Sequence, residues 1–150
     1  MRIGGNCHCG NIRFELAWPA DADAIAARVC NCSFCVRHAA VWTAHPQAGL
    51  TVYVAERALI SAYTFATNTA VFQVCARCGV VPLVTSDIAQ HRYAVVNVNA
   101  LTDIDRSRIT RSDASYDSED TDSRLARRQR HWIARVAFAD ECTLQTGADP

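Results

Sequence analysis

Lysine is absent from the sequence, and all fifteen basic residues are arginines. This absence excludes every mechanism that proceeds through a lysine Schiff base, including the chemistry of pyridoxal phosphate. Fifteen acidic residues balance the arginines, so the formal net charge is zero. Because a neutral chain has no overall field that attracts a polyanion, we expect no nucleic-acid partner.

Long apolar runs are also lacking. No stretch approaches the roughly 18 apolar residues of a membrane span. The N-terminal sequence MRIGGNCHCG has no apolar core of the kind that a secretory signal requires. We therefore expect a cytoplasmic protein with no membrane partner. Half of the 150 residues are hydrophobic, which is enough for one conventional core, so we expect residues 1–150 to form a single domain.

Several widespread catalytic motifs are missing as well. The sequence contains no GxSxG, GxGxxG, HExxH or P-loop pattern. These absences exclude the common types of serine hydrolase, dinucleotide-binding enzyme, zinc metalloprotease and nucleotide-binding enzyme.

Short segments rich in β-branched and aromatic residues run through most of the chain. In residues 11–17, Ile12, Phe14 and Leu16 alternate with polar residues, which is typical of a half-buried strand. Similar segments follow at 41–44, 50–54, 58–65, 70–74, 80–85 and 93–98. The pattern predicts an all-β, mainly antiparallel fold.

Two segments depart from this pattern. Residues 20–28 are rich in alanine but short, and residues 122–132 have acidic residues at their start and arginines near their end. The second arrangement complements a helix dipole, so we expect one short C-terminal helix whose charges need no external partner. We place the core at about 3–100 and a C-terminal extension at 101–150.

Seven of the eight cysteines fall into three closely spaced groups. Cys7 and Cys9 form CxC, Cys30, Cys32 and Cys35 form CxCxxC, and Cys75 and Cys78 form CxxC, whereas Cys142 stands alone. In a reducing cytosol, such spacing favours metal binding over disulfides. Thiolates so close together can converge on a zinc ion at about 2.3 Å, which buried inert thiols have no reason to do. We interpret the eighth cysteine as a free or buried thiol.

Glycines indicate which groups join. Gly10 follows Cys9 and Gly79 follows Cys78, and glycine permits the positive-φ turn that wraps backbone around a metal. We therefore combine these two groups into one closed structural zinc site, formed by Cys7, Cys9, Cys75 and Cys78.

The third group supplies only three ligands. A tetrahedral zinc held by Cys30, Cys32 and Cys35 keeps one position open, where it can polarise a carbonyl or bind a thiol as thiolate. This prediction makes two zinc ions per chain, one structural and one catalytic. The alternative is that a histidine or carboxylate closes the second site and makes it structural too. The histidines nearest to cysteine groups are His8, His38 and His45.

Three motifs together resemble a known family. GNCHCGNIRFE, CNCSFCVRH and CARCG, in this order, are similar to the glutathione-dependent formaldehyde-activating enzymes and their relatives, which include centromere protein V. The resemblance covers about 3–100, with a weaker echo in RLARRQRHWIARV. It implies a tent-like β fold with a four-cysteine structural zinc and a three-cysteine catalytic zinc at the positions named above. It also implies a carbon–sulfur lyase that joins glutathione and formaldehyde into S-hydroxymethylglutathione.

Two functional hypotheses follow. The first is a zinc-dependent enzyme that forms or cleaves adducts between a thiol and a small aldehyde. The second is a non-catalytic zinc domain that binds a protein, for which the arginine-rich segment 124–135 is the candidate surface. Arg37 and His38 follow Cys35 and are interpreted as surface residues, whereas Trp42 and Phe72 are interpreted as core residues that could also line a pocket.

Overall fold

Two β-sheets make up most of the protein. The computed structural model describes residues 1–139, so Cys142 lies outside the described part. The smaller sheet has the order β1 (Arg2–Asn6), β2 (Ile12–Ala17), β5 (Gly49–Val54) and β11 (Arg135–Ala139). The larger sheet has the order β10 (Ile109–Ala114), β3 (Ile25–Cys30), β4 (Val41–Thr43), β9 (His91–Asn97), β8 (Leu83–Ile88), β7 (Val71–Cys75) and β6 (Ile60–Tyr63). Most neighbouring strands are antiparallel, which confirms the predicted fold class.

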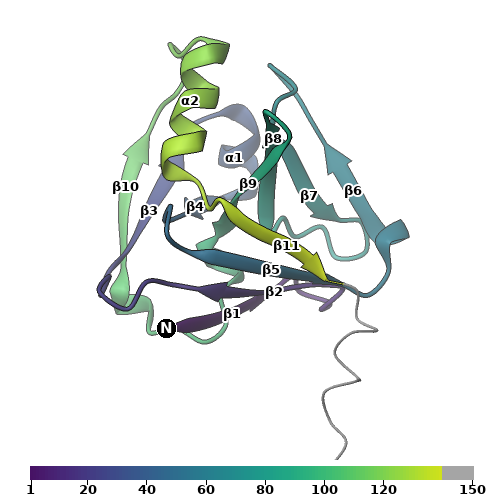
Figure 1. The fold of residues 1–150 in the computed structure, drawn as a ribbon. Coiled ribbons are helices and arrows are strands. Elements are labelled where there is room, and N and C mark those ends of the chain that lie inside the picture. Colours follow the sequence, from purple (N-terminus) through teal and green to yellow (C-terminus); the bar gives the residue numbers. More distant parts are fainter. Residues whose placement is uncertain (140–150) are drawn as a thin grey trace, which may run out of the picture.

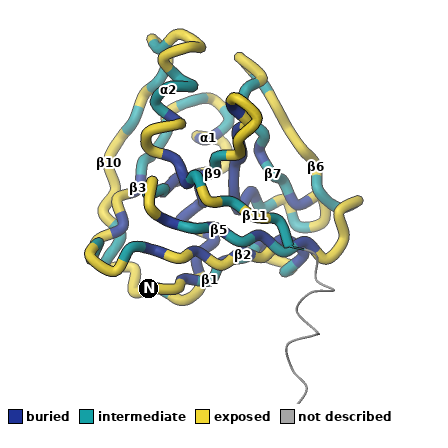
Figure 2. The backbone as a smooth tube through the Cα atoms, viewed as in Figure 1, coloured by how far each residue is buried: buried dark blue, intermediate teal, exposed yellow. Residues whose placement is uncertain are grey.

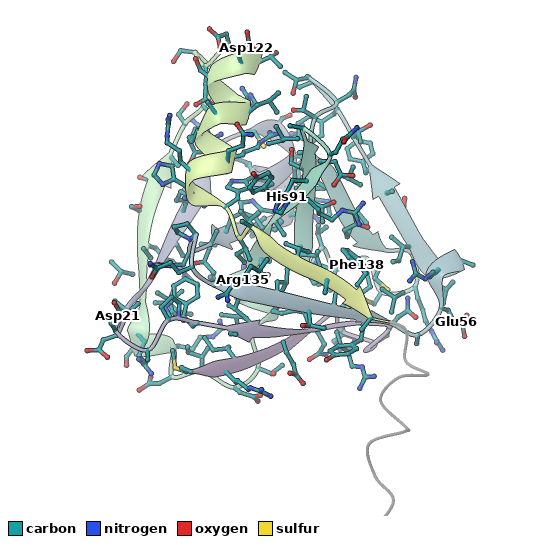
Figure 3. The ribbon with its side chains drawn as sticks, in the orientation of Figure 1. Asp21, Glu56, His91, Asp122, Arg135 and Phe138 are labelled. Atoms are coloured by element: carbon teal, nitrogen blue, oxygen red, sulfur yellow. The ribbon has the colours of Figure 1, made fainter. Side chains whose placement is uncertain are left out.

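The sheets enclose the core in the shape of a tent. The four-stranded sheet forms the base, while β10 and β3 rise on one side and β7 and β6 on the other (Figure 1). Asp21 and Glu56 mark two lower corners of this outline, and Asp122 lies near its top (Figure 3). Buried residues gather along the inner faces of both sheets (Figure 2).

The base sheet follows the alternation seen in the sequence. Ile12, Phe14 and Leu16 of β2 are buried, and the residues between them are exposed. These three side chains belong to the larger hydrophobic cluster, which also includes Leu50 and Val52 of β5. Each apolar residue on the inward face therefore packs against the neighbouring strand, as a half-buried sheet requires.

Two helices lie among the described residues, and three short 3-10 turns join the strands. The helices are α1 (Ser33–His38) and α2 (Thr121–His131), and the turns are Arg57–Leu59, Val98–Ala100 and Arg106–Arg108. The helix expected at 122–132 is thus confirmed as α2. It begins where the Oδ1 of Asp120 accepts a 2.7 Å hydrogen bond from the backbone N–H of Ser123. Among the described residues, no helix has both the length and the apolar character needed to cross a membrane.

The sequence analysis did not predict all of the observed strands and helices. Strands β1, β3, β10 and β11 and the six-residue helix α1 lie where no element was expected. The alanine-rich segment 20–28 leads into β3, which is strand because β4 and β10 pair with it on both sides. Residues 58–65 form a 3-10 turn followed by the shorter β6.

Residues beyond 100 complete both sheets. Strand β10 pairs in parallel with β3, and β11 pairs in parallel with β5. The imidazole Nε2 of His91 lies 2.7 Å from the carbonyl oxygen of Ala134, which ties the segment before β11 to the β8–β9 hairpin. His91, Arg135 and Phe138 are labelled along this seam (Figure 3). Helix α2, which precedes this segment, lies near the top of the tent (Figure 1).

Candidate metal centres and active site

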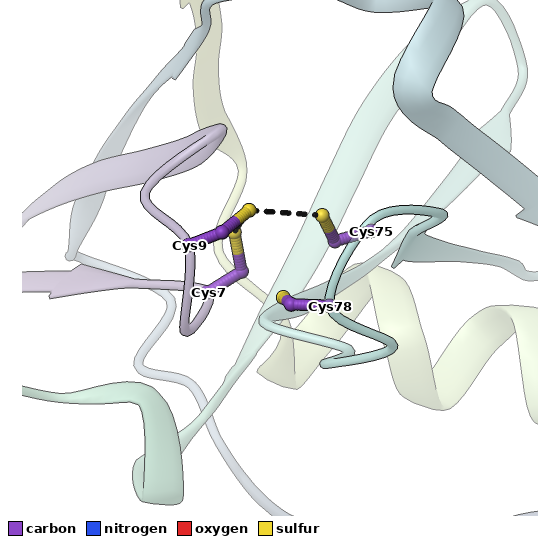
Figure 4. A group of neighbouring side chains, drawn as sticks. All are labelled: Cys7, Cys9, Cys75 and Cys78. Atoms are coloured by element: carbon purple, nitrogen blue, oxygen red, sulfur yellow. Dashed lines mark hydrogen bonds between the residues drawn. The ribbon is translucent and has the colours of Figure 1, made fainter.

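The first cysteine group joins the base sheet to the larger sheet. Cys7 and Cys9 lie just after β1, and Cys75 and Cys78 lie at the end of β7 and in the turn that follows (Figure 4). All four Sγ atoms are within 4.8 Å of one another. The Sγ of Cys9 is 3.8 Å from that of Cys7 and 3.5 Å from that of Cys75. Zinc–sulfur bonds of about 2.3 Å in a tetrahedron place the sulfurs about 3.8 Å apart, so the donor set fits zinc.

Glycine turns shape both halves of this four-cysteine group. Gly10 has a φ of 82° and Gly79 a φ of 81°, which confirms the predicted left-handed turns. The backbone N–H of Gly79 donates a 2.7 Å hydrogen bond to the carbonyl oxygen of Cys75. On the other half, the N–H of Ile12 donates to the Sγ of Cys7 at 3.3 Å. Local backbone geometry therefore aims the sulfurs at one point.

The thiols of this group have divergent proton affinities. Burial raises the pKa of Cys7 to about 12. Burial also acts to raise the pKa of Cys78. Hydrogen bonds from the backbone of Val80 and Cys9, together with those from the thiols of Cys75 and Cys7, outweigh burial and lower this pKa to about 6. A buried thiol such as Cys7 loses its proton readily only beside a cation. In a thiolate site, the bound metal ion is that cation and stabilises the thiolate.

The second group belongs to the other hydrophobic cluster of the core. Cys30 ends β3, Cys32 caps α1 and Cys35 is buried within that helix. Their three Sγ atoms are within 4.8 Å of one another. Among residues 1–139, no histidine or carboxylate joins either group at this distance.

Hydrogen bonds fix the sulfurs of this three-cysteine group. The indole Nε1–H of Trp42 donates to the Sγ of Cys35 at 3.2 Å, and the backbone N–H of Cys35 donates to the Sγ of Cys32 at 3.4 Å. A hydrogen bond from the Cys35 thiol lowers the pKa of Cys30 to about 6, and the same contact raises the pKa of Cys35. A lowered pKa favours the thiolate form in which cysteine binds metal, and the geometry of the group fits a metal ion bound by three sulfurs.

A cavity of about 120 Å³ opens beside the three-cysteine group. Its wall contains all three of these cysteines and none of the other four. Trp42 and Phe72 are only 6% and 8% exposed, and both line this cavity, so they serve as core and as pocket wall. The remaining lining includes polar side chains from β3, the segment before α2, and α2 itself, namely Arg28, Tyr116, Asp117, Arg124, Arg127 and Arg128.

The arginines of the cavity wall were not identified from the sequence. The charges of α2 had a sufficient local explanation in the helix dipole, and nothing in the spacing of Arg124 and Arg128 marks them as pocket residues. By contrast, Arg37 and His38 lie on the surface as expected and do not line the cavity. His38 stacks on Phe34 with ring centroids 4.4 Å apart.

Comparisons with known proteins agree with this geometry. None of the proteins with curated functions is significantly similar to the chain. A solved structure of a Rhodobacter sphaeroides protein is similar, with 26% sequence identity, a TM-score of 0.50 and coverage of 73% of this chain and 99% of its own. The model of one family, described as glutathione-dependent formaldehyde-activating enzyme, matches residues 2–117. Since this match spans both cysteine groups and most of the tent, the chain belongs to the family of glutathione-dependent formaldehyde-activating enzymes.

Proposed function

We propose that the protein is a zinc-dependent enzyme of the carbon–sulfur lyase type, which forms or cleaves adducts between a thiol and a small aldehyde. One observation carries the proposal: the three-cysteine group lines a cavity, whereas the four-cysteine group contributes nothing to that cavity's wall. Membership of the family supports glutathione and formaldehyde as the reactants.

The two groups take different roles in this proposal. Cys7, Cys9, Cys75 and Cys78 offer four sulfurs, a complete tetrahedral set, and would hold a structural zinc. Cys30, Cys32 and Cys35 offer three sulfurs beside a cavity and would hold a catalytic zinc with one position facing the reactants. We place the reaction in the reducing cytoplasm, because free cysteines at ligand spacing suit that compartment.

The reaction is an addition across a carbonyl group. The thiol sulfur attacks the aldehyde carbon, a carbon–sulfur bond forms, the C=O π pair moves to oxygen, and the thiol proton ends on that oxygen. A zinc ion at the three-cysteine group would supply Lewis acidity for the thiol or the carbonyl. Because the chain has no lysine, activation of the aldehyde as a lysine imine is excluded.

The protein's own residues prepare this step. Trp42 orients Cys35 through its indole N–H, so that the three sulfur atoms remain directed at one point. Trp42, Phe65 and Phe72 give the cavity an apolar wall that limits competing water. Arginines in the cavity wall give the site positive charge.

A variant of one cavity cysteine tests the proposal. Thiols add to formaldehyde unaided, so the measurement is the protein-dependent rate of exchange between formaldehyde and its glutathione adduct, followed by NMR. We expect Cys32→Ser to keep the fold, bind about one zinc ion fewer than the parent and lose the rate acceleration. Arg37→Gln, an exposed change on the same helix, should leave the rate unchanged.

Two outcomes would contradict the proposal. Full activity of Cys32→Ser would separate the reaction from the three-cysteine group. A parent protein that binds zinc at both groups but gives no acceleration would instead favour the non-catalytic module that binds a protein.

A further inference from the structure

Arg128 of α2 is a buried cation without an anionic partner. The residue is 6% exposed and lines the cavity of the three-cysteine group. One terminal nitrogen donates to the Oγ1 of Thr69 at 2.8 Å and to the Oγ of Ser86 at 3.2 Å. Its Nε is buried and has no hydrogen-bond partner. Both of its partners are neutral, and no carboxylate of the described residues forms an ion pair with it.

Two further arginines on this wall are in a similar position. Arg124 donates through one nitrogen to the carbonyl oxygen of Tyr116 at 2.9 Å, and its buried Nε has no partner. Burial together with Arg127 and Arg124 lowers the pKa of Arg128 to about 10. In the described chain, none of Arg28, Arg124 and Arg128 forms an ion pair with a carboxylate.

The acidic residues nearby do not change this balance. Arg127 is already paired with Glu119, at 3.0 Å between Nε and Oε2. Asp117 is the single acidic residue on the cavity wall within residues 1–139, and it is exposed. Its only hydrogen bond there is a long one, 3.5 Å from the hydroxyl of Ser115. The arginines of the wall thus outnumber its acidic side chains, and no carboxylate of the described residues pairs with Arg28, Arg124 or Arg128.

A buried charge without a counter-charge is costly, and a bound anion removes that cost. The planar guanidinium fork matches a carboxylate through two parallel hydrogen bonds. We propose that the cavity binds a reactant that carries a carboxylate, with this group held at Arg128 and flanked by Arg124. The reacting end then points toward Cys30, Cys32 and Cys35. This inference rests on the proposed function and narrows its substrate class.

Two reactants could supply the carboxylate. It is either part of the thiol, as in glutathione, or part of the aldehyde, as in glyoxylate. Both place an anion at one end of the cavity and a sulfur or a carbonyl carbon at the other, so the recognition chemistry is shared.

A purely structural role for Arg128 explains only part of the geometry. Its bonds to Thr69 and Ser86 tie α2 to the loop before β7 and to β8, and its guanidinium lies 5.0 Å from the centroid of the Trp132 ring. A neutral side chain that donates hydrogen bonds would do the same without burying a charge. A test must therefore compare the affinities of charged and neutral ligands. A purely structural contact between α2 and its neighbours would not change that ratio.

Calorimetric titration of the zinc-loaded protein provides this measurement. One pair of probes is 3-mercaptopropionate and the neutral 2-mercaptoethanol, and the other is glyoxylate and the neutral glycolaldehyde. We expect the carboxylate of at least one pair to bind about tenfold or more tightly than its neutral match. The pair that shows the preference identifies which reactant carries the carboxylate. Equal affinities within both pairs would overturn the proposal.

Variants then locate the carboxylate. Arg128→Met should remove the preference, whereas Arg130→Met, an exposed change on the same helix, should keep it. If Arg128→Met fails to fold, Arg124→Met and Arg28→Met decide, and an unchanged preference in both would overturn the proposal. Because the titration needs no turnover, a preference without rate acceleration would contradict the proposed function alone, and acceleration without a preference would contradict this inference alone.

Discussion

The indole Nε1–H of Trp42 donates a 3.2 Å hydrogen bond to the Sγ of Cys35. Trp42 lies in β4 and is 6% exposed, so its ring is held by the core of the larger sheet. The bond connects that rigid sheet to the three-cysteine group. An N–H donor to a thiolate ligand orients the sulfur and tunes the charge that it offers to a metal.

Replacing the indole donor of Trp42 should weaken zinc binding at the three-cysteine group. We expect Trp42→Phe to lower zinc affinity at the three-cysteine group, or turnover there, by about ten- to a hundredfold, the usual effect of losing a hydrogen bond to a metal ligand. Competition with a chromophoric chelator measures the affinity. Trp18→Phe is the matched control, because the Nε1 of Trp18 is buried without a partner and belongs to the other core cluster. Equal losses in both variants would assign the effect to packing.

The two cysteine groups should differ in their effect on stability. Cys75 is fully buried and joins β7 to the turn after β1 through the four-cysteine group. Cys75→Ser should therefore remove this link between the two sheets. A loss of about 3 kcal/mol would lower Tm by roughly 10 °C. Cys32→Ser leaves the four-cysteine group intact and should shift Tm much less. Thermal unfolding of zinc-loaded proteins gives both values, and equal shifts would contradict the division into structural and catalytic sites.

A glycine in β1 is required by close packing. A Cβ on Gly5 would lie 2.1 Å from the ring of Phe14, which is 2% exposed and cannot move aside. We expect Gly5→Ala to destabilise the fold by about 1–3 kcal/mol, as overpacking of a core does. A Cβ on Gly49 would meet Ala17 at an ordinary 3.8 Å. Gly49→Ala should therefore be neutral in denaturant unfolding, and a similar loss in both would refute the steric explanation.

The cysteine groups could be predicted from the sequence because ligand spacing is local. Cys9 with Gly10 and Cys78 with Gly79 each form a turn within a few residues, and those turns occur as predicted. The strands that were missed have little local signal. In β10, every residue between Ile109 and Ala114 is exposed, so no alternation marks the strand. Its pairing with β3 is parallel and spans about half of the chain.

The charged side of the cavity could not be predicted for a related reason. Arg128 gains its environment from Thr69 and Ser86, which are 59 and 42 residues away. Only the packing of α2 against β8 brings them together, and no spacing within 122–132 encodes it. Sequence reasoning therefore found the sulfur side of the site and missed the arginine side.

The ion pair at the β8–β9 hairpin should make a small, pH-dependent contribution to stability. Arg92 donates to both carboxylate oxygens of Asp87, at 2.8 and 3.1 Å, and these bonds hold the pKa of Asp87 below its ordinary value of 3.8. A lowered carboxyl pKa means that the contribution is present above the unfolded-state pKa and is lost as the pH falls through the folded-state pKa. Since both side chains are about half exposed, we expect Asp87→Asn to cost only about 0.5 kcal/mol at pH 7.

The effect of the Asp87–Arg92 ion pair must be separated from the acid sensitivity of the two cysteine groups. Protonation of the cysteine ligands lowers the stability of parent and variant alike, so the informative quantity is the difference between them at each pH. That difference should be largest near neutral pH and shrink as the pH approaches 3. Asp21→Asn, an exposed change without a described partner, should show no difference at any pH. A gap between parent and Asp87→Asn that stays constant down to acid pH would mean that shape, and not charge, accounts for the effect.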